Sequence, residues 1–232
     1  VEGINAGHLI EVGARPNTGK TSFHASLVAS PQGFAWQGAK CIILCNEEGY
    51  HRVAHRYITA ATGMDKFEIS KNKHRAMEVF DQIRKNVMFK DATGRDMNWV
   101  ESVCKSYKPD IVILDMGDKF ADIRSERTDI TLKAAAIHAR NIAKQYDCAV
   151  VWMSQLSAEA EGRADLNQAM MEGSKTGKAA EADLMVLIGK TQQAEGEEED
   201  PIRYLNIAKN KLNGFQGKIT CQLDGSRSLY SA

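Results

Sequence analysis

Runs of apolar residues alternate with stretches of helical periodicity along most of the chain. The apolar runs predict strands at residues 8–12, 41–45, 111–114, 149–154, 184–189, 203–208 and 218–223. The helical stretches cover residues 21–30, 51–61, 74–85, 99–106 and 130–145. Most of the strands are too uniformly apolar to face water. The pattern therefore predicts an α/β fold, with a mostly parallel, twisted sheet and helices on both faces.

The last two predicted strands follow each other without a helix between them. Asn213 and Gly214, a pair typical of tight turns, separate them, so we expect the sheet to end in an antiparallel hairpin. The chain has 232 residues, of which 43% are hydrophobic, and it contains no internal repeat. A chain of this size can bury one large core, and we expect a single domain over residues 1–232.

Charge and composition narrow the class of protein. Thirty basic residues balance thirty acidic ones. This balance argues against a protein whose whole surface is basic and binds nucleic acid. No apolar run approaches the roughly 20 residues that cross a bilayer, and the N-terminus does not resemble a signal peptide, so we expect a cytoplasmic protein without a membrane partner. The five cysteines lack C-x-x-C spacing and are interpreted as core thiols. Because the chain begins with Val1 rather than Met, we expect it to be part of a longer protein.

The sequence GARPNTGKTSF, residues 13–23, has the order that a phosphate-binding loop requires: strand, short glycine-containing loop, helix. The strict pattern G-x-x-x-x-G-K-[ST] would place glycine where Ala14 stands. A methyl group is tolerable where the loop leaves the strand, whereas Gly19 must allow close backbone approach. The predicted nucleotide-binding residues are Ala14, Arg15, Pro16, Asn17, Thr18, Gly19, Lys20 and Thr21. Lys20 would reach the terminal phosphates and the Thr21 hydroxyl would ligate Mg²⁺; the alternative is a chance match in a surface loop.

Acidic residues follow two of the apolar strands. Asp115 ends the run IVIL and is the expected metal-binding carboxylate. Asp118 lies off the strand and is interpreted as structural. Glu47 and Glu48 follow the strand CIILC, and from the residues alone they are equal candidates for the base that activates water. The alternative is that they are acids favoured by the start of a helix.

The loop ARPNTGKT resembles the ARPxxGKT loop of the DnaB-type replicative helicases, the RecA-like hexameric P-loop motors of bacteria and phages. Further segments resemble that family in the same order. CIILCNEEGYHRVAHR implies that Glu47 is the catalytic base and that Arg56 matches a later family arginine. IVILDMGDKF implies a metal-binding role for Asp115. VVWMSQLS implies that Gln155 senses the γ-phosphate, and EGSKTGKAAEADLMVLI resembles a loop and strand that line the central channel.

The segment NIAKNKLNGFQGKITCQL resembles the family's final hairpin, which presents a Lys-x-Arg pair to the nucleotide of the neighbouring subunit. Here the pair is Lys209 and Lys211, so lysine replaces an arginine that could bridge two phosphate oxygens. The alternative is that both lysines simply flank a hairpin. Nothing resembles the family's N-terminal collar or a fused primase, so the resemblance covers the motor domain only.

The resemblance also implies contact with single-stranded DNA. Residues 156–183 form a long segment without clear secondary structure, which bears Arg163, Lys175 and Lys178. Segments of this kind grip the DNA backbone in the family, and a few cations per subunit would suffice in a ring of six. The alternative is a mobile, solvated loop.

The implied function is an ATP-dependent (or other NTP-dependent), Mg²⁺-dependent helicase motor that translocates on single-stranded DNA and unwinds duplex. We expect a homo-hexamer in the full-length protein, with a primase or a helicase loader as possible partners. One alternative is a RecA- or KaiC-like ATPase that remodels DNA or protein without unwinding. A nucleotide-binding scaffold with negligible turnover is a further alternative, which the combination of Glu47, Asp115 and Gln155 disfavours, since a scaffold needs no base.

Overall fold

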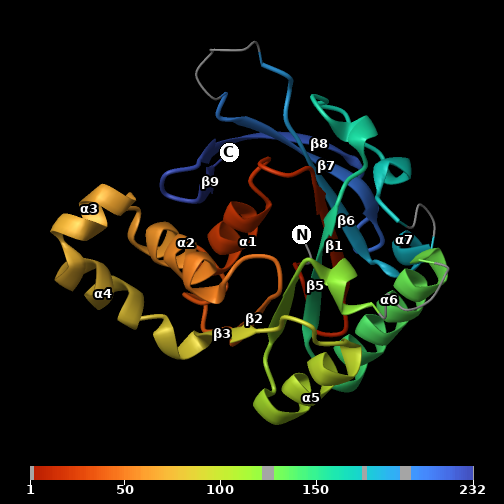
Figure 1. Ribbon diagram of the computed structural model, residues 1–232, viewed down its shortest axis with the longest axis horizontal. Coiled ribbons are helices and arrows are strands. Elements are labelled where there is room, and N and C mark those ends of the chain that lie inside the picture. The colour runs from red at the N-terminus through yellow and green to blue at the C-terminus, as the bar shows by residue number, and fades with distance from the viewer. Residues whose placement is uncertain (1–2, 122–127, 174–176, 194–199, 232) are drawn as a thin grey trace.

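One mixed sheet organises the protein, and helices pack against both of its faces (Figure 1). The computed structural model describes residues 3–121, 128–173, 177–193 and 200–231. Among these residues the sheet has nine strands in the order β3-β2-β4-β5-β1-β6-β7-β8-β9. The six strands from β3 to β6 in this order pair in parallel, and β7, β8 and β9 continue the sheet as antiparallel strands. The predicted fold class, including the final hairpin, is confirmed.

The strands are β1 (Leu9–Ala14), β2 (Cys41–Cys45), β3 (Val87–Asp91), β4 (Ile111–Asp115), β5 (Ala149–Gln155), β6 (Leu184–Gly189), β7 (Ile202–Asn210), β8 (Gly217–Asp224) and β9 (Leu229–Ser231). The α-helices are α1 (Lys20–Ala29), α2 (Tyr50–Thr62), α3 (Lys66–Lys71), α4 (Lys73–Asp81), α5 (Met97–Tyr107), α6 (Thr128–Gln145) and α7 (Gly177–Glu181). Short 3₁₀ turns occur at η1 (Arg84–Asn86), η2 (Gly117–Phe120), η3 (Ala158–Ala160) and η4 (Gln168–Met170).

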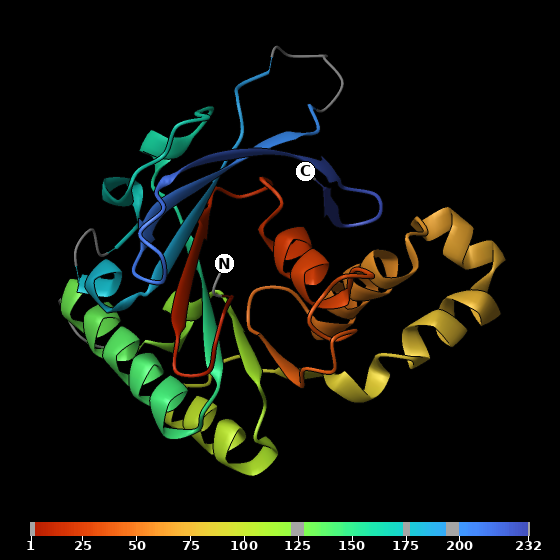
Figure 2. The ribbon, with the colours of Figure 1, turned by 180° about the vertical axis from the view of Figure 1, so that it is seen from behind.

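Alternating side chains of the central strands contribute to two separate cores. In β2, Ile43 points to the core under α1 and α2, whereas Ile42 and Leu44 point to the core under α5 and α6. This alternation follows from the two-residue period of a strand. Figures 1 and 2 show these two pairs of helices on opposite sides of the sheet, with α3 and α4 extending outward beyond α2. Both faces of the parallel strands are therefore covered, which explains their uniformly apolar sequences.

Several elements were not predicted from the sequence, although every predicted strand and helix has a counterpart. The strand β3 lies at the edge of the sheet, and only Val87 of its five residues is buried, so it lacks an apolar run. The predicted helix over residues 74–85 ends earlier, at Asp81, and η1 follows it. The short helix α3 begins with a capping box between Asp65 and Glu68, which is a sequence signal for a helix start.

Residues 156–183 were expected to lack clear secondary structure, and their described part contains short elements instead. Leu156 bridges to Met171, and η3, η4 and α7 fall within the segment. Its apolar side chains form a third core against β6: the buried members are Leu156, Ala160, Leu166, Met170, Met171, Ala179, Met185 and Leu187. The methionines in this core are flexible and polarizable, and such side chains fill irregular spaces well. Residues 174–176 lie outside the described residues.

Two further expectations concern cysteines and membranes. All five cysteines are buried and free, which confirms their interpretation as core thiols. Within the described part of the chain, no helix is both long enough and apolar enough to cross a bilayer.

Candidate active site

The loop between β1 and α1 has a backbone that only certain residues can adopt. Gly19 caps α1 with a φ of 104°, and Asn17 has a φ of 59°. A Cβ atom on Gly19 would lie 2.5 Å from Leu223 Cδ2 and 2.7 Å from the Tyr230 hydroxyl. Glycine is therefore required at this position on both conformational and steric grounds. Ala14 is the buried last residue of β1, so its methyl group belongs to the core and the departure from the strict motif is accommodated.

Two polar side chains of the C-terminal strands contact this loop. Arg203 of β7 is only 1% exposed, and its Nε–H donates a hydrogen bond of 2.9 Å to the Thr18 carbonyl oxygen. The Tyr230 hydroxyl of β9 donates to the Gly19 carbonyl oxygen at 3.2 Å. These contacts fix the positions of two loop carbonyl groups, and the N–H groups of a loop of this kind can bind an anion. Sequence reasoning missed both residues, although a lone arginine within an apolar strand is an available signal.

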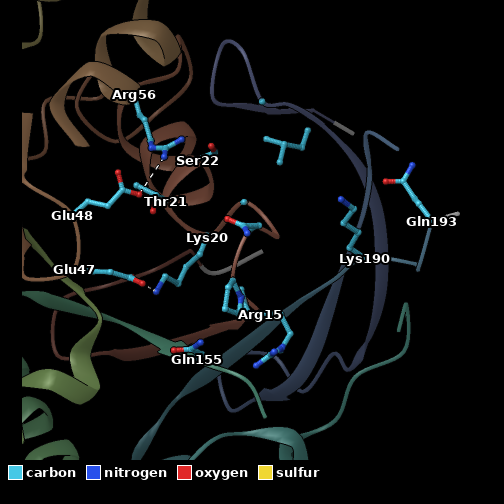
Figure 3. A pocket seen from close by; sticks show the side chains of 16 residues that line it. Arg15, Lys20, Thr21, Ser22, Glu47, Glu48, Arg56, Gln155, Lys190 and Gln193 are labelled. Carbon is cyan, nitrogen blue, oxygen red and sulfur yellow. Dashed lines mark hydrogen bonds and ion pairs between the residues drawn. The ribbon is translucent and has the colours of Figure 1, made fainter. Parts of the chain in front are cut away.

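A cavity of about 760 Å³ opens in front of the loop (Figure 3). It is lined by Ala14, Arg15, Pro16, Asn17, Gly19, Lys20, Thr21, Ser22, Glu47, Glu48, Arg56, Gln155, Lys190, Gln193, Leu223 and Gly225. All predicted loop residues except Thr18 contribute to this lining. The Thr18 side chain is buried, and its hydroxyl lies 3.5 Å from the Pro16 carbonyl oxygen of the same loop. The Thr18 side chain therefore shapes the loop rather than facing the cavity, and nucleotide binding by Thr18 stays a prediction.

The two adjacent glutamates after β2 have different partners, which the sequence could not distinguish. Glu47 Oε2 accepts a hydrogen bond of 2.7 Å from Lys20 Nζ, whereas Glu48 Oε1 accepts one of 3.2 Å from Arg56 Nη2 (Figure 3). Both carboxylates line the cavity. Glu47 is therefore held directly at the phosphate loop, and Glu48 is held by α2.

Asp115 ends β4 with an unusual environment for a carboxylate. Its side chain is 1% exposed, and neither carboxylate oxygen has a hydrogen-bond partner. Burial raises the pKa of Asp115 to about 6, with the nearby Lys20 ammonium opposing the shift. A buried, unpaired carboxylate is costly unless a cation meets it. Asp115 therefore fits a site for a divalent metal ion.

His24 is the nearest cationic candidate, but it does not neutralise Asp115. Its Nε2 lies 3.9 Å from Asp115 Oδ1, while its Nδ1 is 2.9 Å from the Tyr57 hydroxyl. Complete burial lowers the pKa of His24 to about 3, so the ring is neutral at physiological pH. His24 and Thr21 both lie on α1. The contact of His24 with Asp115 therefore places the Thr21 hydroxyl in the same region as the Asp115 carboxylate.

The chemistry of these donors suits Mg²⁺. The described residues hold no group of three or more His, Cys, Asp or Glu side chains that could bind a metal alone. Mg²⁺ usually takes one or two protein oxygens and completes its shell with water and phosphate oxygens. Asp115 and the Thr21 hydroxyl would be those protein ligands, directly or through water.

Gln155 reaches the same cavity from the neighbouring strand. It is the last residue of β5 and pairs in register with Ala14 at the end of β1. Since parallel strands end at a common edge, Lys20, Glu47, Asp115 and Gln155 are brought to one side of the sheet although they are far apart in sequence.

Lys209 and Lys211 lie near the end of the strands that is opposite the cavity. Lys209 pairs with Met185 near the start of β6, whereas Ile188 near the end of β6 pairs with Ala14 beside the cavity. Both ammonium groups donate to the Ala180 carbonyl oxygen of α7, at 3.0 Å and 3.2 Å. Burial, with the neighbouring Lys211 charge, lowers the pKa of Lys209. The pair therefore does not contact the nucleotide cavity of its own chain.

The three side chains expected to bind DNA differ in how exposed they are and in whether the structure describes them. Arg163 is exposed on the segment between β5 and β6, as a backbone contact requires. Lys175 lies outside the described residues. Lys178 is only 2% exposed and donates to Asp118 Oδ1 at 2.6 Å and to Ser154 Oγ at 3.0 Å. Its ammonium is already paired and inaccessible, so the assignment of Lys178 to DNA contact is corrected.

Comparison with known proteins identifies the family. Residues 1–231 match the model of the DnaB-like helicase C terminal domain. The chain belongs to this family. Members of the family are ATP-hydrolysing DNA helicases, and this chain is accordingly a helicase motor.

Solved structures agree with this assignment at the level of the fold. The chain superposes on a separately solved ATPase domain with a TM-score of 0.83 and 20% sequence identity, over 98% of this chain and 85% of that one. It superposes equally well, at TM-score 0.83 and 20% identity, on a DnaB-like replicative helicase described with its interactions with primase. In that case 97% of this chain covers 57% of the other chain. No curated protein has significant similarity to the sequence.

The environment of Asp115 generates a prediction about stability. Folded Asp115 holds its proton to a higher pH than the ordinary value of 3.8, so the free energy of unfolding falls as pH rises through the window up to about 6. Above that window Asp115→Asn removes a buried charge, and in metal-free, nucleotide-free buffer at pH 7.5 it is expected to raise the free energy of unfolding by roughly 1–3 kcal/mol. Urea unfolding at pH 7.5 and pH 4 measures this, and the gain should vanish at the lower pH.

The control is Asp118→Asn, which removes a partner of Lys178 and should lower stability at both pH values. A less stable Asp115→Asn protein at pH 7.5 would contradict the unpaired state of this carboxylate.

Proposed function

We propose that residues 1–232 form one motor domain that couples hydrolysis of Mg²⁺-bound ATP to translocation along single-stranded DNA, and thereby unwinds duplex DNA. The observation that carries this proposal is the meeting of Lys20, Glu47 and Gln155 in one cavity beside the unpaired carboxylate of Asp115. A cation for the phosphates, a base, a metal ligand and a polar sensor are together what phosphoryl transfer to water requires. A domain that merely stored nucleotide would need only the loop.

The ion pair between Lys20 and Glu47 gives the base a defined resting position. When ATP binds, its terminal phosphates compete with the Glu47 carboxylate for the Lys20 ammonium. The phosphates carry more negative charge and are therefore the stronger partner. Glu47 then loses its partner and can accept a proton from the attacking water. Bound Mg²⁺ would supply neutralisation of the developing phosphate charge. The exchange of partners ties release of the base to occupancy of the site.

Gln155 is proposed as the sensor of the γ-phosphate. Its amide can both donate and accept hydrogen bonds, and its strand leads directly into the segment from 156 onward. Arg15 adds a second link, because it lines the cavity and donates to the Leu156 carbonyl oxygen at 3.0 Å. The phosphate loop is thus in direct contact with the segment proposed to meet DNA.

We further propose that the ATP site is completed by the neighbouring subunit of a homo-hexamer. Lys209 and Lys211 lie away from the cavity of their own chain, at the opposite end of β6 and β7. A head-to-tail arrangement of subunits brings one end of a domain against the other end of the next, and it closes into a ring when the rotation permits. The lysines would then add positive charge to the γ-phosphate in trans, with less geometric control than arginine.

Contact with single-stranded DNA is assigned to Arg163 and Lys175. Arg163 is exposed between β5 and β6, within the segment that follows the proposed sensor Gln155. Six copies of two cations would form a positive channel even though each chain has zero net charge. A primase or loader is a possible partner, since one structural neighbour is described with primase.

A RecA- or KaiC-like ATPase that remodels DNA or protein without unwinding is the second candidate. The fold and the nucleotide cavity are compatible with either activity. The family match over residues 1–231 favours the helicase.

The roles of Lys20 and Glu47 are separable by mutation. Lys20→Ala should abolish ATP binding, because it removes a contact to the ground-state phosphates. Glu47→Gln should retain binding but reduce turnover by roughly 10²–10⁴-fold, because it removes only the base. Fluorescent-nucleotide titration, steady-state turnover and strand displacement on forked DNA measure these effects, and neither variant should displace a strand.

Glu48→Gln is the matched control, since Glu48 lines the same cavity but pairs with Arg56. If that variant loses turnover and Glu47→Gln does not, the base is Glu48. If wild-type protein hydrolyses ATP but never separates a forked substrate, the second candidate function replaces the first.

Catalysis in trans predicts complementation between inactive subunits. A Lys211→Ala subunit keeps its base, and a Glu47→Gln subunit keeps its hairpin lysines. Mixed rings should therefore regain part of the ATPase activity that each variant lacks, because interfaces that join an intact base to intact lysines reappear. Loss of the trans charge should reduce turnover by up to about a thousandfold. Activity of mixtures across the full range of ratios tests this, with thermal melting to confirm that each variant is folded.

A strictly additive activity curve would argue against a shared site. So would a rate per subunit that stays constant on dilution in protein shown to be monomeric throughout.

Neutralising the two proposed DNA contacts should weaken binding and its salt dependence. Each phosphate contact that Arg163→Ala or Lys175→Ala removes should lower the slope of log K against log salt by about 0.7 for single strands. Fluorescence anisotropy of a labelled oligonucleotide over a salt series provides the slope. Lys105→Ala on α5 is the control and should leave the slope unchanged. Equal slopes for the double variant and wild type would exclude both residues from the interface.

A further inference from the structure

A buried cluster of charged side chains lies immediately behind the nucleotide cavity. Lys178 Nζ is 2.6 Å from Asp118 Oδ1, 3.0 Å from Ser154 Oγ and 3.5 Å from Glu11 Oε1. Ser154 Oγ is in turn 3.2 Å from Glu11 Oε1. Lys178, Glu11 and Ser154 are each buried, and Asp118 is mostly so. The Trp152 indole N–H also donates to Asp118 Oδ1, at 2.9 Å. The ATP site as described uses none of these groups.

The position of each member in the chain shows what the cluster joins. Asp118 lies three residues after Asp115, and Ser154 is the residue before Gln155. Glu11 lies within β1, three residues before its end at Ala14. Lys178 is the second residue of α7, which follows directly after residues 174–176. One ammonium group therefore holds together the strand ends that carry the metal ligand, the sensor and the phosphate loop, and attaches α7 to all three.

Such a cluster is an expensive way to stabilise a fold. A buried ion pair costs desolvation energy that its Coulomb attraction repays only in part, and apolar side chains of similar size often do as well or better. Burial raises the pKa of Glu11, with Lys178 opposing the shift. The Glu11 Oε2 atom has no hydrogen-bond partner. The cluster is thus not optimised for stability, whereas directional contacts from one cation fix the relative positions of four elements.

We propose that Lys178 is a positioning residue that couples the nucleotide site to α7, so that a change of nucleotide state at Asp115 and Gln155 moves the second half of segment 156–183. This inference rests on the proposed function for the nucleotide-site roles of Asp115 and Gln155 and for DNA as what the segment meets. Arg15 connects the first half of the same segment to the phosphate loop, through Leu156 and through Glu161 at 2.8 Å. Leu156 also bridges to Met171, so the two halves meet near the ATP site, whereas α7 contacts the strand ends of that site through Lys178.

The contact of α7 with these strand ends through Lys178 makes a sharp experiment possible. Hydrogen–deuterium exchange is measured with and without Mg²⁺ and a non-hydrolysable ATP analogue, in peptides that span residues 157–161 and 177–183. In wild-type protein both peptides should change their exchange rate on nucleotide binding. In Lys178→Met the response of 177–183 should be lost while that of 157–161 persists. Nucleotide affinity is measured by titration for each variant, and the exchange is compared at nucleotide concentrations that saturate both proteins.

Two further variants separate positioning from stability. Glu11→Gln, Asp118→Asn and Lys178→Met together remove every charge of the cluster, which should restore folding stability if Lys178→Met alone is too unstable to study. The proposal expects this triple variant to melt near the wild-type temperature and still lack the response of 177–183. Lys218→Met is the matched control, because Lys218 pairs at 2.6 Å with Asp165 of the same segment but contacts no strand end of the ATP site. That control should keep both responses.

A second measurement connects the cluster to turnover. Single-stranded DNA should stimulate wild-type ATP hydrolysis, and the stimulation should fall by roughly tenfold in the triple variant, a typical size for coupling between sites. If the triple variant recovers the exchange response of 177–183, or if wild-type 177–183 does not respond to nucleotide, the cluster is purely structural and the proposal is overturned. If DNA fails to stimulate the wild-type enzyme, the proposed function fails, and the exchange experiment still decides the role of Lys178.

Discussion

The common edge at which parallel strands end is the constraint on which the rest of the site depends. β2, β4, β5 and β1 are neighbours in the sheet, and each contributes a functional group at or just beyond its last residue. Glu47, Asp115, Gln155 and the phosphate loop become neighbours only because all four strands run in the same direction. The two helical layers keep these strands buried and in register. The chemistry is therefore assembled by backbone pairing, and side-chain packing determines how precisely the groups are held.

Short sequence patterns along the chain were sufficient to predict the sheet, its covering helices and most residues of the cavity. Apolar strands and a glycine-containing loop before a helix are signals contained in short segments. The edge strand β3 was not predicted because only one of its side chains is buried, so its sequence has no apolar run. The packing of residues 156–171 was not predicted because its apolar side chains follow no regular period. Glu47 and Glu48 could not be ranked from their order alone, since the partner of each depends on where α1 and α2 lie.

Lysine provides a clear example of what the sequence cannot determine. Lys20 faces an anion cavity, Lys178 is enclosed by acids, and Lys209 and Lys211 donate to carbonyl oxygens of a neighbouring helix. All four have the same side chain, and a basic residue in a polar segment is ordinarily exposed. The burial of Lys178 follows from Glu11 and Asp118, which are distant in sequence and join it only in the folded sheet. Tertiary neighbours, rather than residue type, decide which lysines can meet a phosphate.

The contacts that brace the phosphate loop also constrain how the protein acquires its activity during synthesis. Residues 15–19 are made early, yet the carbonyl oxygens of Thr18 and Gly19 are held by Arg203 and Tyr230, near the end of the chain. Contacts between such distant residues form late, because closing the intervening loop costs chain entropy. A nascent chain still attached to the ribosome can form β1 and α1 but lacks the strands that brace the loop between them. Nucleotide binding at full strength must therefore wait for the last strands.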